Sequence, residues 1–531
     1  MSTKLYLRED AYFEPLINHW FAWSYLIPPV QASRYITSTH KRIMTSFVKN
    51  SQLHIMATQE SALTGGEFLN AREDQVKDIQ GFLDEIDNKY TDICELSEAV
   101  KTLDELIRSH TSGESIEYLY ELVPDPLKGY VEIFLDMNHN PSYRILEKLM
   151  YNSEHYNKGL QTVSFGVLTK VEERPFAFST PRIPDENHIQ LPLDFNHPDV
   201  ETIIRSRTEG APAEEIEAIF SRHESIGGLD YRELFTEQAP TRLHQKPKAD
   251  ELKLTFLGHA SFMLETQDVS ILMDPVIAVR GESYADDCIS YSELPDKIDY
   301  ICITHNHQDH YNIETLIQLR HKTDKLVVPV NNGGSLADPS MKLIGQELGF
   351  EVIEVDDFDE ILIPDGKLIA IPFLGEHGDL NVRSKNVWFI ELKGKKFFFG
   401  ADATNCDSHM YKHVHKLVGD VDILAIGMEC VGAPYTWLYG ALNTKIVSKN
   451  IKNSRRLNGA NAEQAYHMVD TFNAKHVYLY AMGMEPWYKY FMGVDYEDDS
   501  EQIIESDKMI NFCSEKNIPC ERMAGKAIIN L

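Results

Sequence analysis

The chain has 531 residues, of which 43% are hydrophobic, so it is long enough for more than one folded domain. Its 82 acidic and 51 basic residues give a net charge of −31, which disfavours a nucleic-acid substrate because the overall field repels phosphate. The seven cysteines are scattered, odd in number and without a CxxC pair, which argues against a disulfide framework or a structural zinc site.

The chain also lacks the sequence features of a secreted or membrane protein. The N-terminal residues 1–10 contain no signal-peptide core, and no run of about 18 apolar residues occurs anywhere in the sequence. We therefore expect a cytoplasmic protein that does not cross a membrane.

The N-terminal half shows helical periodicity but no motif that carries chemistry. Prolines punctuate the segment from Arg174 to Val200, which predicts irregular structure or short strands. A polar, proline-containing stretch from Ala239 to Lys248 is the best candidate for a linker, so we expect a separate N-terminal α+β domain over residues 1–245 and a second domain over residues 250–531. The helices predicted in the first part lie within Ala71–Ser109, Tyr130–Met137, Tyr143–Tyr151 and Ala213–Arg222.

The most informative segment is an HxHxDH motif that follows the largely apolar run Ile298–Ile303. An extended backbone places His305 and His307 on the same side, and a turn then brings Asp309 and His310 to a second position. Four such ligands can serve two metal ions. Imidazole nitrogen and carboxylate oxygen suit zinc, iron or manganese, and a pair of these ions can activate oxygen species.

The motif and its surroundings resemble the metallo-β-lactamase superfamily over about Leu252–Leu531. Leu254–Leu264 followed by Ser270–Pro275 is similar to the opening β-hairpin of that family, with Asp274 at a strand end. Phe397–Asp402 resembles the strand that delivers the carboxylate bridging both metals, which implies this role for Asp402. The resemblance implies a C-terminal αββα sandwich, with the site at one edge of its two facing sheets.

The remaining ligand positions separate the possible reactions. Zinc hydrolases of the superfamily take a third His from a downstream loop, where this chain has Glu376 and His377 side by side. Backbone alternation lets one of the two face the metals, and the residues alone do not choose between them. The hydrolases take a last His from a strand near the C-terminus, but the end of the strand His476–Met484 reads Ala481-Met482-Gly483. A missing ligand leaves a coordination position that suits dioxygen.

The Glu376–His377 pair and the missing last His resemble one branch of the superfamily, the diiron β-hydroxylases known from the chloramphenicol pathway. This resemblance spans nearly the whole chain. The resemblance implies a glutamate ligand at Glu376, with His377 outside the ligand set. It also implies an oxo-bridged pair of irons, O2 as co-substrate, an external electron donor, and an aminoacyl-phosphopantetheine substrate on the carrier domain of a nonribosomal peptide synthetase. The implied metal ligands are His305, His307, Asp309, His310, Glu376 and Asp402.

Three further features have alternative interpretations. Glu429 follows the apolar strand Val421–Met428, so its carboxylate either holds the ammonium of an aminoacyl substrate or supports a metal-ligating His. His259 is either a polar residue close to the cluster or a core His with a satisfied hydrogen bond. The cluster of basic residues from Lys445 to Arg456 is either a solvated helix face or a docking patch for an acidic protein or a phosphate.

Two classes of function therefore compete, with a third behind them. The favoured one is an O2-dependent diiron monooxygenase that β-hydroxylates a carrier-bound aminoacyl group, with Glu376 and Glu429 as candidate catalytic residues. The alternative is a binuclear zinc hydrolase in which His377 is the missing ligand. The third is a metal-binding but inert partner protein. The N-terminal domain would serve carrier docking or dimerisation, so a homodimer is possible.

Overall fold

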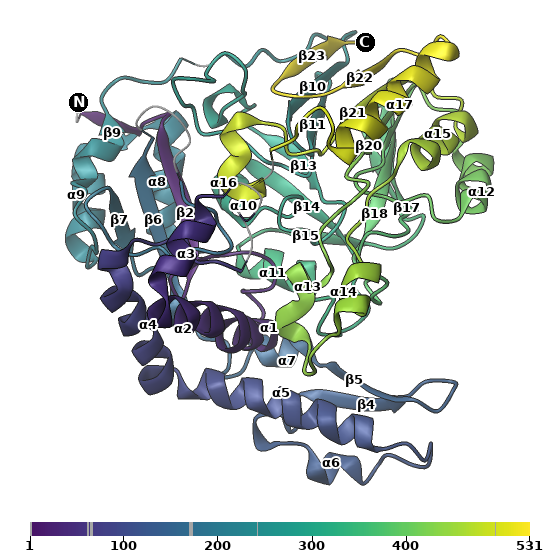
Figure 1. Cartoon of the computed structure of the whole chain (residues 1–531). Coiled ribbons are helices and arrows are strands. Elements are labelled where there is room, and N and C mark those ends of the chain that lie inside the picture. Colours follow the sequence, from purple (N-terminus) through teal and green to yellow (C-terminus); the bar gives the residue numbers. More distant parts are fainter. Residues whose placement is uncertain (1–2, 61–62, 64–66, 169–173, 242, 494) are drawn as a thin grey trace.

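The computed structural model describes residues 3–60, 63, 67–168, 174–241, 243–493 and 495–531. Its C-terminal part is built on two seven-stranded mixed sheets that face each other (Figure 1). The first sheet contains, in spatial order, β15 (Val352–Val355), β14 (Thr323–Pro329), β13 (Ile298–Cys302), β12 (Ser270–Met273), β11 (Ser261–Glu265), β10 (Lys253–Gly258) and β23 (Ala527–Asn530). The second contains β16 (Glu360–Ile363), β17 (Gly366–Pro372), β18 (Asn386–Leu392), β19 (Lys395–Phe399), β20 (Ile423–Gly427), β21 (His476–Tyr480) and β22 (Cys520–Arg522).

Helices cover the outer faces of both sheets, which completes the predicted αββα sandwich. The buried side chains between the sheets are mostly aromatic and aliphatic, among them Phe262, Trp388 and Phe399. A further apolar cluster lies between the second sheet and its helices, as expected for strands buried on both faces. The helices of this part are α10 (Ile313–Leu319), α11 (Met341–Glu347), α12 (Ser408–Val418), α13 (Thr436–Tyr439), α14 (Lys449–Ser454), α15 (Ala462–Thr471), α16 (Lys489–Met492) and α17 (Glu501–Glu515).

The N-terminal part combines small sheets with helices, which agrees with the α+β prediction. Its strands are β1 (Lys4–Leu7), β2 (Ala11–Ile17), β3 (Trp20–Phe21), β4 (Val131–Leu135), β5 (Pro141–Ile145), β6 (Gln161–Val167), β7 (His188–Leu191), β8 (Ala211–Pro212) and β9 (Phe235–Thr236). Its helices are α1 (Pro29–Arg34), α2 (Lys41–Lys49), α3 (Ser51–Thr58), α4 (Val76–Lys89), α5 (Thr91–Ser109), α6 (Leu119–Leu122), α7 (Glu147–Tyr151), α8 (Pro198–Glu209) and α9 (Ala213–Arg222). A π-helical turn, Tyr35–His40, joins α1 to α2.

The helix predicted over residues 130–137 is wrong, because this segment forms β4 and pairs with β5 in an antiparallel hairpin. Buried Val131 and Ile133 alternate with more exposed neighbours, which is the period of two expected of a strand. The Asp136 side chain accepts hydrogen bonds from the backbone of Asn138 and Asn140, so it closes the turn. The helix predicted over Tyr143–Tyr151 begins only at Glu147, because Pro141–Ile145 forms β5. The helix predicted over Ala213–Arg222 has the predicted bounds.

The two parts of the chain share one continuous hydrophobic core. Buried residues of the N-terminal strands, such as Phe13 and Phe165, belong to the same cluster as Leu316 of α10 and Ile344 of α11. The N-terminal part therefore forms the outer cover of the first sheet. The division at residues 245–250 stays a prediction, although no helix or strand lies between Thr236 and Lys253 in the described residues, and Arg242 is outside them.

A buried ion network also crosses this interface. Arg174 Nη1 donates to both carboxylate oxygens of Glu314 at 3.1 Å, and the Tyr490 hydroxyl donates to the same carboxylate at 3.0 Å. Glu14 on β2 lies 4.0 Å from Arg174 and accepts two hydrogen bonds from Arg182, at 2.7 and 2.8 Å. Glu314 is on α10, the helix that follows the metal motif, so the network anchors that helix to the N-terminal part.

No described helix is both long and apolar enough to span a bilayer.

Candidate metal centre

The HxHxDH motif occupies the loop between β13 and α10, and all four of its candidate ligands are buried. The loop is fixed at its far end because the Asn312 side chain caps α10 by accepting from the backbone of Thr315. Within the loop, the backbone of His310 donates to the carbonyl of His307 at 3.1 Å. This turn brings Asp309 and His310 back toward the two preceding histidines, as the sequence predicted.

Two groups of possible ligand atoms lie beside each other. In the first, His307 Nδ1 contacts Glu376 Oε1, and His305 Nε2 lies 3.5 Å from Glu376 Oε2. In the second, His310 Nε2 lies 3.0 Å from Asp402 Oδ2 and 3.7 Å from Asp309 Oδ2. The Asp402 carboxylate is also 3.8 Å from His305 Nε2, so it stands between the two groups. This is the position that a bridging carboxylate requires.

Each candidate histidine ligand has one ring nitrogen held by the protein and the other directed at the centre. His305 Nδ1 is 3.0 Å from the Thr304 hydroxyl, and His307 Nε2 is 3.0 Å from the Tyr439 hydroxyl. His310 Nδ1 is 2.8 Å from Asp274, whose other oxygen accepts from the backbone of Thr304. Metal-ligating histidines show this pattern because the outer contact fixes the ring and its tautomer.

The donor set fits a pair of iron ions. Buried His305 Nε2, Glu376 Oε2 and Asp402 Oδ1 have no hydrogen-bond partner among the described residues, although buried polar atoms are normally satisfied. Bound cations at these positions would satisfy all three atoms. Three imidazoles and three carboxylates make a set rich in anionic oxygen, which suits iron.

Opposite charges are concentrated in the centre. Burial alone would raise the pKa of Glu376, but His307, His377 and His305 outweigh it and hold that pKa well below its ordinary value. Burial alone would lower the pKa of His310, but the carboxylates around it raise that pKa well above its ordinary value. The Glu376 carboxylate therefore stays ionised, as a metal ligand must.

Glu376 and its neighbour His377 both reach the metal centre. Glu376 has a left-handed backbone, with φ of 66°, directly after Gly375 at 87°. His377 Nδ1 lies 3.0 Å from His307 Nε2 and 3.3 Å from Glu376 Oε2, but His377 belongs to neither of the two groups of ligand atoms. Simple strand alternation could not choose between these neighbours because the backbone is not extended here.

Strained backbone is common around the centre. His259, Asp274, Ala401 and Ala481 have positive φ values of 47°, 37°, 44° and 54°. Such conformations are costly for residues other than glycine and cluster at functional sites. Ala481 stands at the end of β21, where the hydrolases carry their last His, while His476 lies at the start of that strand, 3.3 Å from Glu521.

Glu429 follows β20 and lines a cavity of about 210 Å³ that reaches the candidate ligands Glu376 and Asp402. Burial raises the pKa of Glu429 well above its ordinary value, and the nearby carboxylates of Asp402, Asp309 and Glu376 add to the rise. Trp437 and Phe491 line the same cavity, so an organic substrate would meet an apolar wall opposite the carboxylates.

The sequence did not assign a role to several residues that the structure brings to the centre. Tyr439 on α13 holds His307. Buried His259 lies 3.1 Å from Asp309 Oδ2, so of its two interpretations the contact supports a polar residue close to the cluster. From the N-terminal part, the Ser24 hydroxyl donates to the carbonyl of Asn306 at 2.8 Å, and Asn306 Nδ2 donates to the Tyr25 hydroxyl at 3.2 Å. The two N-terminal contacts join residues about 280 positions apart, so no local pattern could reveal them.

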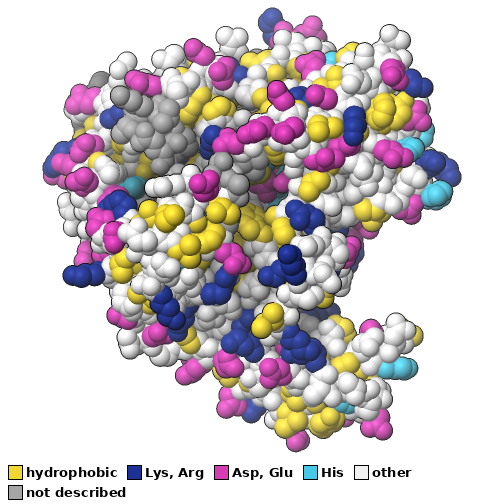
Figure 2. Space-filling view, in the orientation of Figure 1, with side chains coloured by type: hydrophobic (Ala, Val, Ile, Leu, Met, Phe, Trp, Pro, Cys, Tyr) yellow, Lys and Arg dark blue, Asp and Glu magenta, His cyan; other side chains and the backbone are white. Residues whose placement is uncertain are grey.

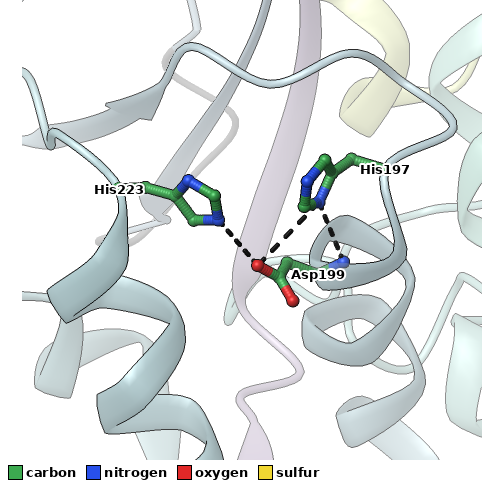
Figure 3. A group of neighbouring side chains, drawn as sticks. All are labelled: His197, Asp199 and His223. Atoms are coloured by element: carbon green, nitrogen blue, oxygen red, sulfur yellow. Dashed lines mark hydrogen bonds and ion pairs between the residues drawn. The ribbon is translucent and has the colours of Figure 1, made fainter.

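Another His and Asp group lies far from this centre in the sequence, between α8 and α9. Figure 3 shows the imidazoles of His197 and His223 directed toward the Asp199 carboxylate. His197 Nδ1 accepts from the backbone of Asp199 at 3.1 Å, and Asp199 Oδ2 is 2.6 Å from His223 and 3.5 Å from Arg222. These contacts use the ligand atoms within the protein, so we interpret the group as the cap that ties α8 to α9.

The basic cluster divides into two parts. Lys445 and Lys449 are exposed and Lys452 is half-buried, near or on α14. Arg455 instead donates from Nε to the carbonyl of Gly378 at 2.6 Å, and its guanidinium lies 4.3 Å from the centre of the Tyr435 ring. Arg455 therefore supports the loop that carries Glu376. Replacing Arg455 would disturb this loop as well as the surface charge.

The fold and the paired ligand groups define a dinuclear metalloenzyme of the metallo-β-lactamase type. Residues 253–452 match the beta-lactamase superfamily domain, and residues 6–239 match the family described as diiron non-heme beta-hydroxylase N-terminal domain. The chain belongs to the family of diiron non-haem β-hydroxylases, which use two irons and O2. Membership of this family supports the predicted hydroxylase over the alternative zinc hydrolase.

Two matches from Streptomyces venezuelae, one to a curated sequence and one to a solved structure, cover nearly the whole chain. One is 4-amino-L-phenylalanyl-(CmlP-peptidyl-carrier-protein) 3-hydroxylase, which is 35% identical over 97% of this chain and 98% of its own length. The other is the crystal structure of CmlA, a diiron beta-hydroxylase, with a TM-score of 0.92, 33% identity and full coverage of both chains. An N-acyl-phosphatidylethanolamine-hydrolyzing phospholipase D from Caenorhabditis elegans is 26% identical over only 32% of this chain and 52% of its own length.

Proposed function

We propose that the protein β-hydroxylates an aminoacyl group held as a thioester on the phosphopantetheine arm of a nonribosomal peptide synthetase carrier domain. Its first metal would be held by His305, His307 and Glu376, and its second by Asp309 and His310, with Asp402 between the two. The observation that carries this proposal is the placement of the Glu376 carboxylate against both His305 and His307, where a zinc hydrolase has a third His.

The irons would supply the reductive activation of O2. With two electrons from an external donor and two protons from solvent, one oxygen atom would enter the substrate C–H bond and the other would leave as water. The protein's own residues hold and orient the reactants. Tyr439 and Asp274 fix the rings of His307 and His310 through the contacts described above. We assign Glu429 to the substrate, because its side chain lines the cavity beside the metal ligands, and an aminoacyl ammonium bound there would favour its ionised form.

The carrier-bound form of the substrate is supported by similarity over the whole chain. The relative whose printed name specifies an aminoacyl group on a peptidyl carrier protein aligns with 97% of this chain, including the N-terminal part. An external electron donor and a possible homodimer remain predictions. We also propose a cytoplasmic location, which suits the free thiols of the seven cysteines.

A single-turnover assay tests the proposed function. Chemically reduced, iron-loaded enzyme is mixed with O2 and an aminoacyl-loaded carrier domain, and mass spectrometry follows the addition of one oxygen atom. We expect hydroxylation of the carrier-bound group and none of the free amino acid. Metal analysis should give about two irons per chain, in keeping with the oxygen-rich ligand set. Stoichiometric zinc without iron, or equal turnover of the free amino acid, would contradict the proposal.

A further inference from the structure

A second cavity lies beside the metal centre, at the interface between the N-terminal helices and the segment 436–452. We call it the interdomain cavity; its volume is about 400 Å³, within the range of about 300–1,000 Å³ typical of small-molecule sites. Its walls come from β3, the π-helical turn, α2 and α13, including Trp20, Tyr35, Ser38, Ile43 and Trp437. π-Helical segments are rare and are often found at functional sites.

The interdomain cavity and the cavity at the metal centre share part of their walls. Trp437 and Leu438, both on α13, line the two cavities. The next residue of this helix, Tyr439, contacts His307 of the metal motif. A ligand that fills the interdomain cavity therefore lies against the same helix that supports the metal centre.

The wall of the interdomain cavity carries polar atoms with no partner among the described residues. Trp20 Nε1, the Tyr35 hydroxyl and His40 Nδ1 are all buried and lack hydrogen bonds there. Burial lowers the pKa of His40 to about 3, so its imidazole is neutral and can accept a hydrogen bond. These three atoms are closed off from the open space of the cavity. The polar side chains that face it include the half-buried Thr39 and Asn443, which suit a ligand with neutral amide or hydroxyl groups.

The outer part of the cavity is basic. Lys445 and Lys452 line it, as does Arg42, which is paired with Glu67 at 3.0 Å. Figure 2 shows Lys and Arg side chains around the middle of this face, with Asp and Glu side chains among them. Positive charge at the entrance of an otherwise acidic protein favours a ligand that ends in a phosphate.

We propose that the interdomain cavity receives the phosphopantetheine arm of the carrier domain, an inference that rests on the proposed function. The arm has the required order of groups: a phosphate, then a hydroxyl and two amides on an aliphatic chain, and finally the thioester. Lys445 and Lys452 contact the phosphate, Thr39 and Asn443 meet the hydroxyl and the amides, and the aminoacyl end passes Trp437 toward Glu429.

Binding of the isolated arm tests this assignment without turnover. Phosphopantetheine and pantetheine are titrated separately onto the iron-loaded full-length enzyme, and binding is followed through the fluorescence of Trp20, Trp23 and Trp437, which line the cavity. We expect phosphopantetheine to bind about tenfold or more tightly than pantetheine, as charge-assisted contacts to one phosphate allow. The Lys445→Glu/Lys452→Glu variant should abolish this preference, whereas Lys412→Glu/Lys416→Glu, with two exposed lysines of α12, should retain it.

Blocking the cavity provides a second test. Ser38→Trp should prevent binding of both probes and reduce turnover of the carrier-bound substrate by about tenfold or more, by analogy with the loss of a well-formed contact. Ser38→Ala should behave like the wild type, and all variants should retain their iron. Equal binding and turnover in the two Ser38 variants, or a phosphate preference that survives in Lys445→Glu/Lys452→Glu, would overturn the assignment.

Failure of the proposed function and failure of the cavity assignment give different experimental results. If the wild-type enzyme hydroxylates no carrier-bound aminoacyl group, the proposed function is wrong, and the binding titrations alone then decide the cavity. Phosphopantetheine binding that is lost in Ser38→Trp and kept in Ser38→Ala would still support the cavity as an arm site. No binding to the wild-type enzyme would reject it.

Discussion

Replacing Glu314 by Gln should change how the stability of the protein depends on pH. Glu314 is only 2% exposed. Burial raises the pKa of its carboxyl group to about 7 from 4.5, against the attraction of Arg174, and the nearby Glu14 adds to the rise. The difference of about 2.5 between these pKa values corresponds to about 3 kcal/mol, at about 1.4 kcal/mol for each pKa unit.

The folded and the unfolded protein bind the Glu314 proton with different affinities, and this difference sets the direction of the pH effect on stability. Since the folded-state pKa is the higher one, the folded protein holds this proton more tightly than the unfolded chain does. The contribution of Glu314 to the free energy of unfolding is therefore fully present below about pH 4.5 and is lost as the pH rises to about 7. Gln does not titrate, so the variant should gain about 2.5 kcal/mol relative to the wild type between about pH 5 and pH 8.

Urea unfolding at both pH values measures this change. The wild type, Glu314→Gln and the control Glu95→Gln are compared, because the Glu95 side chain is exposed on α5. The control should differ from the wild type by the same amount at each pH. A difference between Glu314→Gln and the wild type that stays constant within about 0.5 kcal/mol would refute the reasoning, because that is the scatter expected of a neutral surface change.

Two further predictions concern the metal centre, and a third concerns the stability of α15. Glu376→Ala should lose iron, whereas His377→Ala should keep both irons with an altered rate; metal analysis distinguishes them, and the reverse result would make His377 the ligand. Tyr439→Phe removes the hydroxyl that holds His307 and should weaken iron binding by about 10–100-fold in a chelator competition, while unchanged affinity would argue against this support. Asn461→Ala removes the capping box of α15 and should cost about 1 kcal/mol in urea unfolding, with no change in iron content.

The sequence predicted the catalytic half well because its signals are local. Apolar runs gave the central strands, and the functional residues follow directly after them: His305 after β13, Asp402 after β19 and Glu429 after β20. Parallel strands bring their carboxyl ends to one edge of a sheet, so residues far apart in the sequence converge there. The family resemblance then favoured Glu376 as the proposed ligand, a choice that the alternation pattern alone had left open.

The parts that escaped prediction depend on contacts between distant segments. The Ser24 and Tyr25 contacts with Asn306 join opposite ends of the first 310 residues, and Tyr439 reaches His307 from another helix. The sequence pattern predicts helix for the β4–β5 hairpin because its short strands carry few residues on each face. That prediction does not include the turn that the Asp136 side chain closes. Both kinds of error arise where tertiary pairing outweighs local propensity.

The shared core has a consequence for protein engineering. Without the residues that precede β10, the outer face of α10 and α11 would become a large exposed apolar surface, which favours aggregation. The Asn306 amide would also lose its bond to Tyr25 beside two candidate iron ligands. Fragment expression, or transplantation of this oxidation chemistry into a smaller hydrolase scaffold, should therefore treat the whole chain as the minimal unit and vary Tyr25 and Asn306 together.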